Sequence, residues 1–184
     1  MPSDLDRQIE RFAKKLGKIK SIEVPRANAS ALNKSAQRVK TRSVQSISKQ
    51  TRVPQKDIRK RVAIGRATAK KQIAEVKSYV KPVPASALLT KAQIANKIGT
   101  GTNRQGVRAK GYQWKGAFIN RGRNDNVHVF QRKGKARLPI EAVKIDIDKP
   151  ARRIVKTVSR RVINSDYKRL LEQDLKFRLN KYGR

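Results

Sequence analysis

The sequence contains no cysteine and only one histidine, His128, in 184 residues. Without cysteine the chain can form neither a disulfide nor a thiolate metal site. A single histidine cannot supply the group of imidazoles that a zinc site uses. We therefore expect no metal and no cofactor.

Long apolar runs are also missing. No stretch approaches the roughly 18 apolar residues that a membrane-spanning helix needs. Residues 1–9 lack the apolar core of a secretory signal peptide. We therefore expect no membrane partner, and we expect the protein to stay in the cytoplasm in which it is made.

The residue groupings of known catalytic sites are absent as well. His128 lies in an expected strand, and the nearest acid, Asp125, falls in the adjoining turn, so no orienting acid and nucleophile accompany it. Asp146 and Asp148 share one face of a strand, but dedicated cation sites use more oxygen ligands. Gly99-Thr100-Gly101 lacks the spacing of a nucleotide-binding loop. The sequence therefore favours a protein that is not an enzyme.

Acidic residues are scarce. The chain has 47 lysines and arginines against 13 aspartates and glutamates, which gives a formal net charge of +34. Residues 26–140 alone hold 28 bases and three acids. Because self-repulsion at this density opposes folding of an isolated chain, an acidic partner should share its environment. Nucleic acid and acidic protein surfaces both fit, and a membrane is the weakest candidate.

Helical periodicity dominates the first third of the chain. Residues 4–19 carry an apolar stripe at helical spacing, made of Leu5, Ile9, Phe12, Leu16 and Ile19. A second helix is expected to begin after Pro25 and to run to about Thr51. Its apolar face contains mostly small residues and gives little hydrophobic stabilisation, so it needs a neighbour, which another subunit could supply. A short helix over residues 55–61 should follow.

The rest of the chain predicts a small sheet and more helix. Alternation predicts a strand over residues 69–83, and the glycine-rich residues 98–116 read as a long loop that is flexible or ordered on assembly. Residues 117–131 predict a β-hairpin, and residues 138–147 predict a third strand whose inward candidates are Ile140, Ala142 or Val143, Ile145 and Ile147. Two C-terminal helices follow, the second capped by Ser165.

The expected fold class is therefore α+β: N-terminal helices, a small mostly antiparallel sheet with a β-hairpin, and two C-terminal helices. We expect one domain over residues 1–184. Its parts would be a basic helical segment (1–68), a sheet (69–147) and the C-terminal helices (148–184).

Two dense groups of basic residues are candidates for contact with an acidic partner. One follows Pro54, and the other surrounds two aromatic residues in the glycine-rich loop. Bases interleaved with aromatics suit phosphate contact combined with base stacking. The candidate nucleic-acid-binding residues are Lys56, Arg59, Lys60, Arg61, Arg66, Lys70, Lys71, Arg104, Arg108, Lys110, Tyr112, Trp114 and Lys115. Contact with acidic protein surfaces stays open, and DNA readout should be independent of sequence because no base-reading motif is evident.

Residues 115–150 contain a distinctive order of short motifs. They are Gly116-Ala117-Phe118-Ile119, His128-Val129, Gln131-Arg132, Pro139-Ile140, Val143-Lys144-Ile145 and Pro150. Their order and spacing resemble the minor tail protein Z family of long-tailed bacteriophages and prophages, as do the length and basicity of the chain. The positions that we expect to shape the sheet and its subunit contacts are Gly116, Phe118, His128, Gln131, Pro139 and Ile140.

This resemblance implies a structural virion component that completes the tail at its upper end, near the head–tail joint. Its implied partners are the tail tube and tail terminator proteins, the head–tail connector and the DNA end. By analogy with tails we expect a homo-oligomeric ring of sixfold symmetry. Deletion of residues 104–115 is expected to spare folding but to spoil DNA retention. The alternative is a sequence-independent RNA- or DNA-binding protein, such as a ribosomal or nucleoid component.

Overall fold

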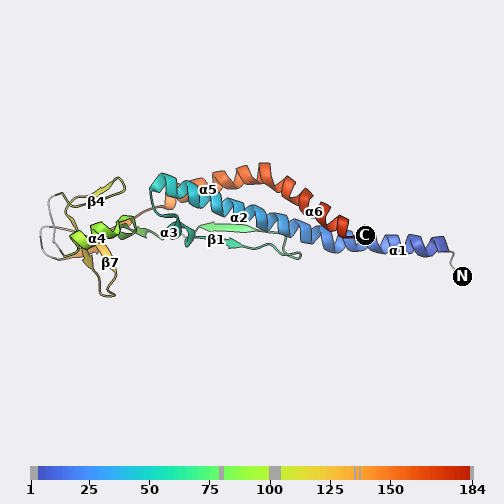
Figure 1. Cartoon of the computed structure of the whole chain (residues 1–184), viewed down its shortest axis with the longest axis horizontal. Helices are drawn as coiled ribbons and strands as arrows, with labels where there is room; N and C mark the ends of the chain where they lie inside the picture. The colour runs from blue at the N-terminus through green and yellow to red at the C-terminus, as the bar shows by residue number, and fades with distance from the viewer. Residues whose placement is uncertain (1–3, 79–80, 100–104, 135, 137, 183–184) are drawn as a thin grey trace. The chain divides into compact units, whose positions relative to one another are not determined.

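The computed structural model describes residues 4–78, 81–99, 105–134, 136 and 138–182, and these form helices and small antiparallel sheets (Figure 1). The predicted α+β class is confirmed. The elements gather into two compact units. Unit 1 comprises Met1–Ser43, Val62–Ser78 and Ile154–Arg184, and unit 2 comprises Val44–Arg61 and Tyr79–Arg153.

Unit 1 begins with helix α1 (Asp4–Lys18) and helix α2 (Val24–Thr51), joined by the wide helical turn η1 (Ile19–Glu23). Both predicted helices are confirmed, but Pro25 causes no break. Instead the Val24 N–H donates to the Ile19 carbonyl, five residues back, which is the hydrogen bond of a π-turn. The helical run is therefore continuous from α1 into α2, and α2 continues into unit 2 from Val44.

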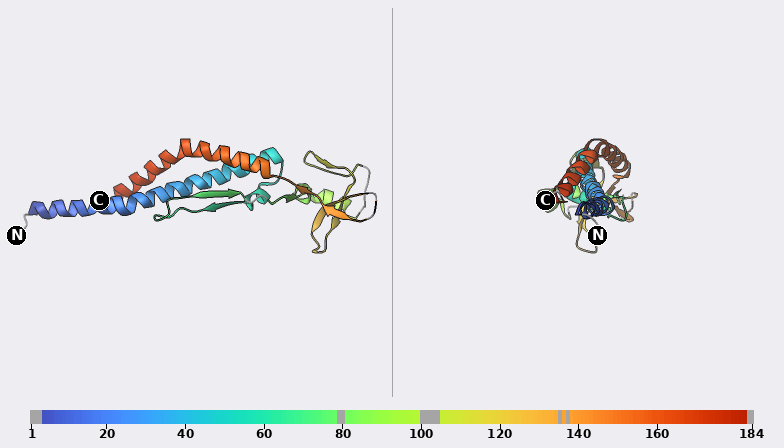
Figure 2. Two further views of the ribbon diagram at one scale, coloured as in Figure 1. Left: turned by 180° about the vertical axis from the view of Figure 1, so that it is seen from behind. Right: turned by 90° about the vertical axis from the view of Figure 1, so that its right-hand side faces the viewer.

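The small-residue face of α2 is well buried. Ala27 and Ala31 are fully buried, and Ala36 and Val39 are nearly so. In Figure 1 and in the left-hand view of Figure 2, the C-terminal helical run lies along one side of α2 and the hairpin of β1 (Val62–Gly65) and β2 (Glu75–Ser78) lies along another. The neighbour that the thin face requires is therefore supplied within the chain itself.

The predicted strand over residues 69–83 is wrong in extent, because among its described residues (69–78 and 81–83) only β2 and Val83 of the two-residue β3 (Val83–Pro84, in unit 2) are extended and paired; residues 79–80 lie outside the described residues. Side-chain amides hold the preceding segment to α2. Asn33 exchanges two hydrogen bonds with the backbone of Ala67, at 2.9 and 2.8 Å, and the Gln72 amide donates to the Pro25 carbonyl at 3.1 Å. These bonds replace the ladder that a longer strand would need.

The C-terminal run consists of α5 (Asp148–Val162), the π-turn η3 (Ile163–Tyr167) and α6 (Lys168–Tyr182). The two predicted helices are confirmed, but Ser165 is not a cap. Its hydroxyl donates to the Arg161 carbonyl at 2.8 Å, inside a helical run that does not stop.

Unit 2 contains α3 (Gln55–Arg59), which ends two residues earlier than predicted because β1 follows it. Two elements that the sequence analysis missed are the 3-10 turn η2 (Ala85–Leu88) and helix α4 (Lys91–Lys97). Thr90 and Gln93 form a capping box at the start of α4, with Thr90 Oγ1 accepting from the Gln93 N–H at 3.2 Å. That Thr-x-x-Gln spacing was the available signal for the helix.

The predicted hairpin is confirmed as β6 (Ala117–Arg121) paired with β7 (Val127–Arg132). The predicted third strand is broken into β8 (Ile140–Ala142), which pairs with β7, and β9 (Lys144–Ile145), which pairs with β3. Val143 causes the break, since its N–H donates to Val129 and its carbonyl accepts from Ala85. Ile140 is 37% exposed, so its predicted inward position is wrong.

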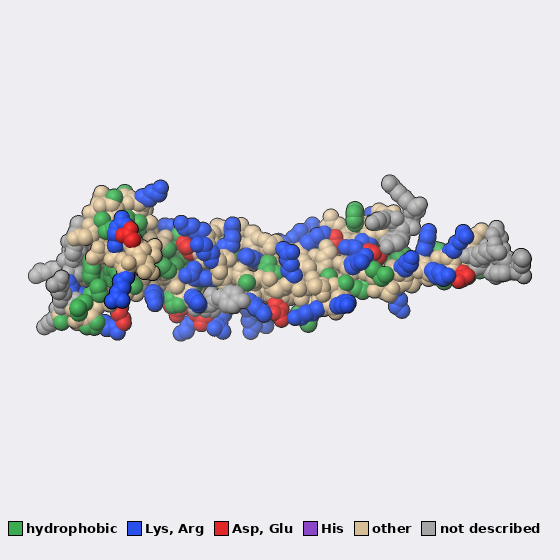
Figure 3. All heavy atoms as spheres, turned by 90° about the horizontal axis from the view of Figure 1, so that it is seen from below, with side chains coloured by type: hydrophobic (Ala, Val, Ile, Leu, Met, Phe, Trp, Pro, Cys, Tyr) green, Lys and Arg blue, Asp and Glu red, His purple; other side chains and the backbone are tan. Residues whose placement is uncertain are grey.

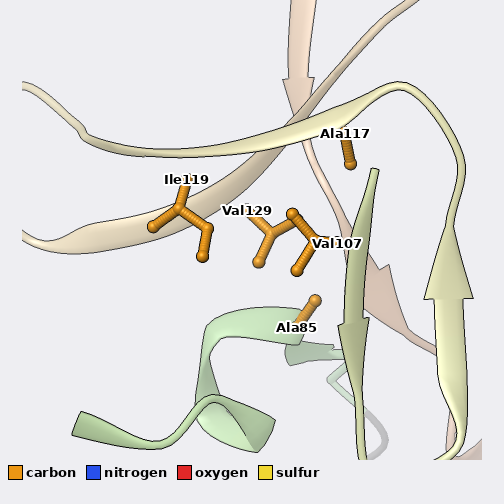
Figure 4. Close-up of a cluster of buried hydrophobic side chains, with 5 residues drawn as sticks. All are labelled: Ala85, Val107, Ala117, Ile119 and Val129. Atoms are coloured by element: carbon orange, nitrogen blue, oxygen red, sulfur yellow. The ribbon is translucent and has the colours of Figure 1, made fainter. Parts of the chain in front are cut away.

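The glycine-rich segment is not a plain loop. Its described part folds into the hairpin of β4 (Val107–Ala109) and β5 (Tyr112–Trp114). Side chains from β4, β6, β7 and η2 converge in one cluster, in which Val107, Ile119 and Val129 are at most 3% exposed (Figure 4). Deletion of residues 104–115 would remove Val107 from this core, so we expect the deletion to disturb the fold of unit 2.

Among the described residues, no helix is both long and apolar enough to cross a membrane.

Candidate nucleic-acid interface

The tip of the β4–β5 hairpin is tied to the end of α2. Arg52 Nη1 donates to the Lys110 carbonyl at 3.0 Å, and the Tyr112 hydroxyl donates to the Thr51 carbonyl at 3.0 Å. Gly111 has a φ of +85°, and a side chain there would meet the Arg52 guanidinium. These contacts bring the hairpin tip next to the chain segment that leads into α3.

Five of the predicted basic residues lie on these two segments of unit 2, the β4–β5 hairpin and α3 with the residue after it, and all five have exposed side chains. We call them the unit 2 basic surface: Lys56, Arg59, Lys60, Arg108 and Lys110. Beside the hairpin lies an open hollow of about 430 Å³, lined by Arg108, Lys110, Gln93 and the tip residues. Exposed cations around a shallow hollow suit phosphate groups, which need neutralisation more than enclosure.

Arg61 has a different role from its neighbours. Its guanidinium donates to the carbonyls of Lys81 at 2.9 Å, Asp57 at 2.7 Å and Pro82 at 3.2 Å. Three of its five donors are therefore engaged with the backbone. We assign Arg61 to holding the chain around α3 and do not include it in the basic surface.

The two aromatic candidates are engaged with each other. The rings of Tyr112 and Trp114 stack with centroids 5.7 Å apart and an interplanar angle of 6°. Trp114 also packs against the core cluster, and the Tyr112 hydroxyl is tied to α2. Both rings therefore brace the hairpin, and Lys115 follows them with an exposed side chain.

The remaining basic candidates fall elsewhere. Arg66, Lys70 and Lys71 lie in unit 1, on the loop between β1 and β2, and all three are exposed. Thr68 organises this loop, since its Oγ1 accepts from the Lys71 N–H at 2.9 Å. The structure therefore divides the run from Lys56 to Lys71 between two units. Arg104 lies outside the described residues.

The family-motif positions lie on or beside the three-stranded sheet. His128 and Phe118 are half-buried, and both belong to the face that carries a row of rings. The Phe118 and Phe130 centroids are 5.9 Å apart, and those of His128 and Phe130 are 5.7 Å apart. Phe118 therefore does not belong to the core cluster. Within the described residues, His128 Nδ1 is buried without a hydrogen-bond partner.

The other motif positions shape turns and edges of the same sheet. Gly116 has a φ of +67° between β5 and β6. The Gln131 amide donates to the Lys115 carbonyl at 3.0 Å. Pro139 directly precedes the edge strand β8, and its carbonyl accepts from the Lys133 N–H at 3.2 Å. Ile140 lies partly exposed in that edge strand.

Several of the few acids are held inside unit 1 by cations of α2 and α6. Asp166 lies 3.0 Å from Arg38 and 3.1 Å from Arg42, and Asp174 pairs with Lys34. Glu23 contacts Arg178 at 2.7 Å. All three carboxylates are buried. These pairs were not predicted from the sequence, although Arg38 and Arg42 are one helical turn apart and so share a face of α2.

These contacts change the titration of two acids. The Arg38 guanidinium lowers the pKa of Asp166, helped by Ser165 and Arg42 against the effect of burial. Burial acts to raise the pKa of Asp174, but hydrogen bonds from Lys34 and Ser30 and the charges of Lys34 and Arg178 lower it overall. Both folded-state pKa values therefore lie below those of the unfolded chain.

Acid should consequently destabilise unit 1. Groups with a depressed pKa contribute stability above their unfolded pKa, about 4, and that contribution is lost as the pH falls through the folded value. We expect the helical thermal midpoint to fall between about pH 4 and pH 2. In the double variant Asp166→Asn, Asp174→Asn this fall should be shallower, as followed by circular dichroism. Equal slopes for the two proteins would contradict the assignment.

Asp146 and Asp148 show no cation site. Asp146 Oδ1 accepts from the Asp148 N–H at 2.8 Å, and the Asp148 carboxylate accepts from Arg152. Both acids therefore organise the start of α5. The described residues hold no group of three or more His, Cys, Asp or Glu side chains placed to bind a metal ion.

In the space-filling view, lysines and arginines cover much of the visible face and acids are few among them (Figure 3). Together these observations define a strongly basic α+β protein with outward-facing cations and several internally paired acids. The model of the family described as prophage minor tail protein Z (GPZ) matches residues 7–183. The chain belongs to this family.

Two curated relatives agree with the family. The chain is 33% identical over 161 residues to the tail completion protein of Escherichia phage N15, covering 86% of this chain and 87% of that protein. It is 28% identical over 152 residues to tail completion protein Z of Escherichia phage lambda, covering 77% and 79%. No solved structure matches the chain.

Proposed function

We propose that this protein is a structural component of a phage tail, without a catalytic role, that completes the tail at its upper end and holds the DNA end. Family membership supports the tail role, because both relatives are named tail completion proteins. Membership also favours this role over a ribosomal or nucleoid protein. In this role the chain would pack on tail tube and terminator proteins and on the connector, as a ring of copies.

The observation that carries the DNA contact is the unit 2 basic surface. Two of its cations lie on the β4–β5 hairpin and three lie in or directly after α3, and the contacts of Arg52 and Tyr112 tie the hairpin tip to the segment that leads into α3. The acid nearest to these cations in the sequence is Asp57, and its side chain is half-buried. Exposed cations on these segments can meet the phosphates of any DNA sequence. The unit 1 loop with Arg66, Lys70 and Lys71 is a second, separate candidate contact.

Neutralising α3 should weaken DNA binding in a salt-dependent way. The triple variant Lys56→Ala, Arg59→Ala, Lys60→Ala should lower the slope of log affinity against log salt by about 2.7, since each phosphate contact contributes about 0.9. Fluorescence anisotropy with a random-sequence duplex at several salt concentrations measures this slope.

The control removes the same charge elsewhere. Lys156→Ala, Arg160→Ala, Lys176→Ala changes three exposed residues of α5 and α6. This control should keep a slope close to that of the unaltered protein. If the salt-dependence slope falls by the same amount in both triple variants, DNA binds cations all over the protein and the unit 2 basic surface is not the DNA site.

A further inference from the structure

Helix α1 carries an apolar stripe that nothing in the described chain covers. Ile9 is 59% exposed, Phe12 64% and Leu16 50%, and every described side chain from Gln8 to Lys18 is exposed. The stripe follows a spacing of three and four residues, which places these side chains on one face of the helix. Most helical stability in proteins comes from packing of an amphipathic face, so we expect this uncovered face to meet a partner.

The shape of the stripe favours a protein partner. The alternation of three and four is the narrow seam that helices use to pack against other helices. A helix that lies on a lipid surface needs a broader apolar face. The stripe therefore fits a groove on a folded protein, in the manner of an amphipathic helix in an apolar cleft.

The charges around the stripe define that groove further. Residues 8–22 hold five bases, at Arg11, Lys14, Lys15, Lys18 and Lys20, and one acid, Glu10, which pairs with Lys14 at 2.8 Å. At about 100° per residue, Lys15 and Lys20 flank the stripe on its two sides. A second copy of this helix would bring like charges together, whereas an acidic rim would complement them.

We propose that α1 docks its stripe of Ile9, Phe12 and Leu16 into an apolar groove with an acidic rim on another protein of the tail. The location of the groove in the tail rests on the proposed function. The exposed position of the stripe means that its substitution should leave the core of unit 1 unchanged.

The test uses purified tails assembled without this protein. The chain is mixed with these tails, the tails are sedimented, and the bound chain is measured. The variant Phe12→Ser, Leu16→Ser should bind at least about tenfold more weakly, because two buried apolar anchors are lost. The double variant Lys15→Glu, Lys20→Glu should also weaken binding to tails, because it places negative charge against the acidic rim. If the stripe only stabilised the helix, this variant would bind normally. The control Phe177→Ser, Leu179→Ser alters two exposed apolar residues of α6 and should bind normally.

The possible outcomes separate the two proposals. If the unaltered chain binds and the stripe variant binds equally well, the docking proposal is overturned while the tail role stands. If the unaltered chain does not bind tails, both proposals fail. If light scattering shows that the unaltered chain is a dimer and that the stripe variant is a monomer, the stripe binds a second copy of the chain. That result would overturn the proposal of an acidic groove on another protein. If the unaltered chain binds phosphatidylglycerol vesicles and the stripe variant does not, the stripe binds a lipid surface, and the proposal is likewise overturned. Circular dichroism confirms that each variant is folded.

Discussion

Replacing Gly106 with alanine is expected to unfold the β4–β5 hairpin and most of unit 2 with it. Gly106 has a φ of +67°, and a Cβ atom there would lie 1.9 Å from the Trp114 carbonyl oxygen and 2.8 Å from the Trp114 carbonyl carbon. These are backbone atoms, so no side-chain rotation can relieve the clash. Together the clash and the left-handed backbone conformation should lower the free energy of unfolding of unit 2 by about 4 kcal/mol or more.

Trp114 is the only tryptophan and lies in the same hairpin, so its fluorescence during denaturation reports directly on unit 2. The matched control is Gly116→Ala. Gly116 has the same φ, but its added Cβ would meet nothing within 4 Å, so only the backbone term of about 1 kcal/mol remains. Equal losses for the two variants would show that the close approach of Gly106 to Trp114 does not exist.

The second large effect is expected from Asp166→Asn in unit 1. This change removes the charge that Arg38 and Arg42 share, and it leaves two guanidinium groups facing one neutral amide. Asp166 is buried whereas both guanidinium groups are partly exposed, and breaking such a partly buried network from one side is costly because the partner charges remain. We expect the helical thermal midpoint, followed by circular dichroism, to fall by about 5 °C.

Glu172→Gln provides the comparison for this variant. Glu172 lies on α6 and its pair with Lys168 is exposed and 3.9 Å long, so its loss should leave the midpoint almost unchanged. The transition reported by Trp114 belongs to unit 2 and should move less than the helical signal in Asp166→Asn. If Asp166→Asn is as stable as Glu172→Gln, the internal ion pairs do not stabilise unit 1.

Much of the fold could be predicted because long periodic segments leave few alternatives. The stripe of α1 and the hairpin of β6 and β7 follow directly from residue spacing. The glycine-rich segment was predicted as a loop because the sequence does not show which backbone conformation each glycine adopts. Positive φ at Gly106, Gly111 and Gly116 turns the chain at both ends and at the tip of a compact hairpin.

The sequence predicted which basic residues are candidates for the interface, but it did not predict which of them belong to the same unit. The run from Lys56 to Lys71 looks continuous in sequence, yet β1 carries its second half into unit 1. Arg61 is indistinguishable from its neighbours in sequence, and only three backbone carbonyls reveal its different role. Contacts across 140 residues, such as that between Lys34 and Asp174, have no local signature at all.

The π-turn η1 sets the direction in which the stripe of α1 faces. A π-turn accommodates one more residue than an α-helical turn, so it offsets the phase of the helix before it by about 100° relative to the helix after it. Deletion of one residue between Ile19 and Glu23 would restore α-helical bonding and rotate α1 about its own axis, while α2 kept its buried face. The orientation of the stripe is thus encoded by a residue count and not by the chemistry of any side chain.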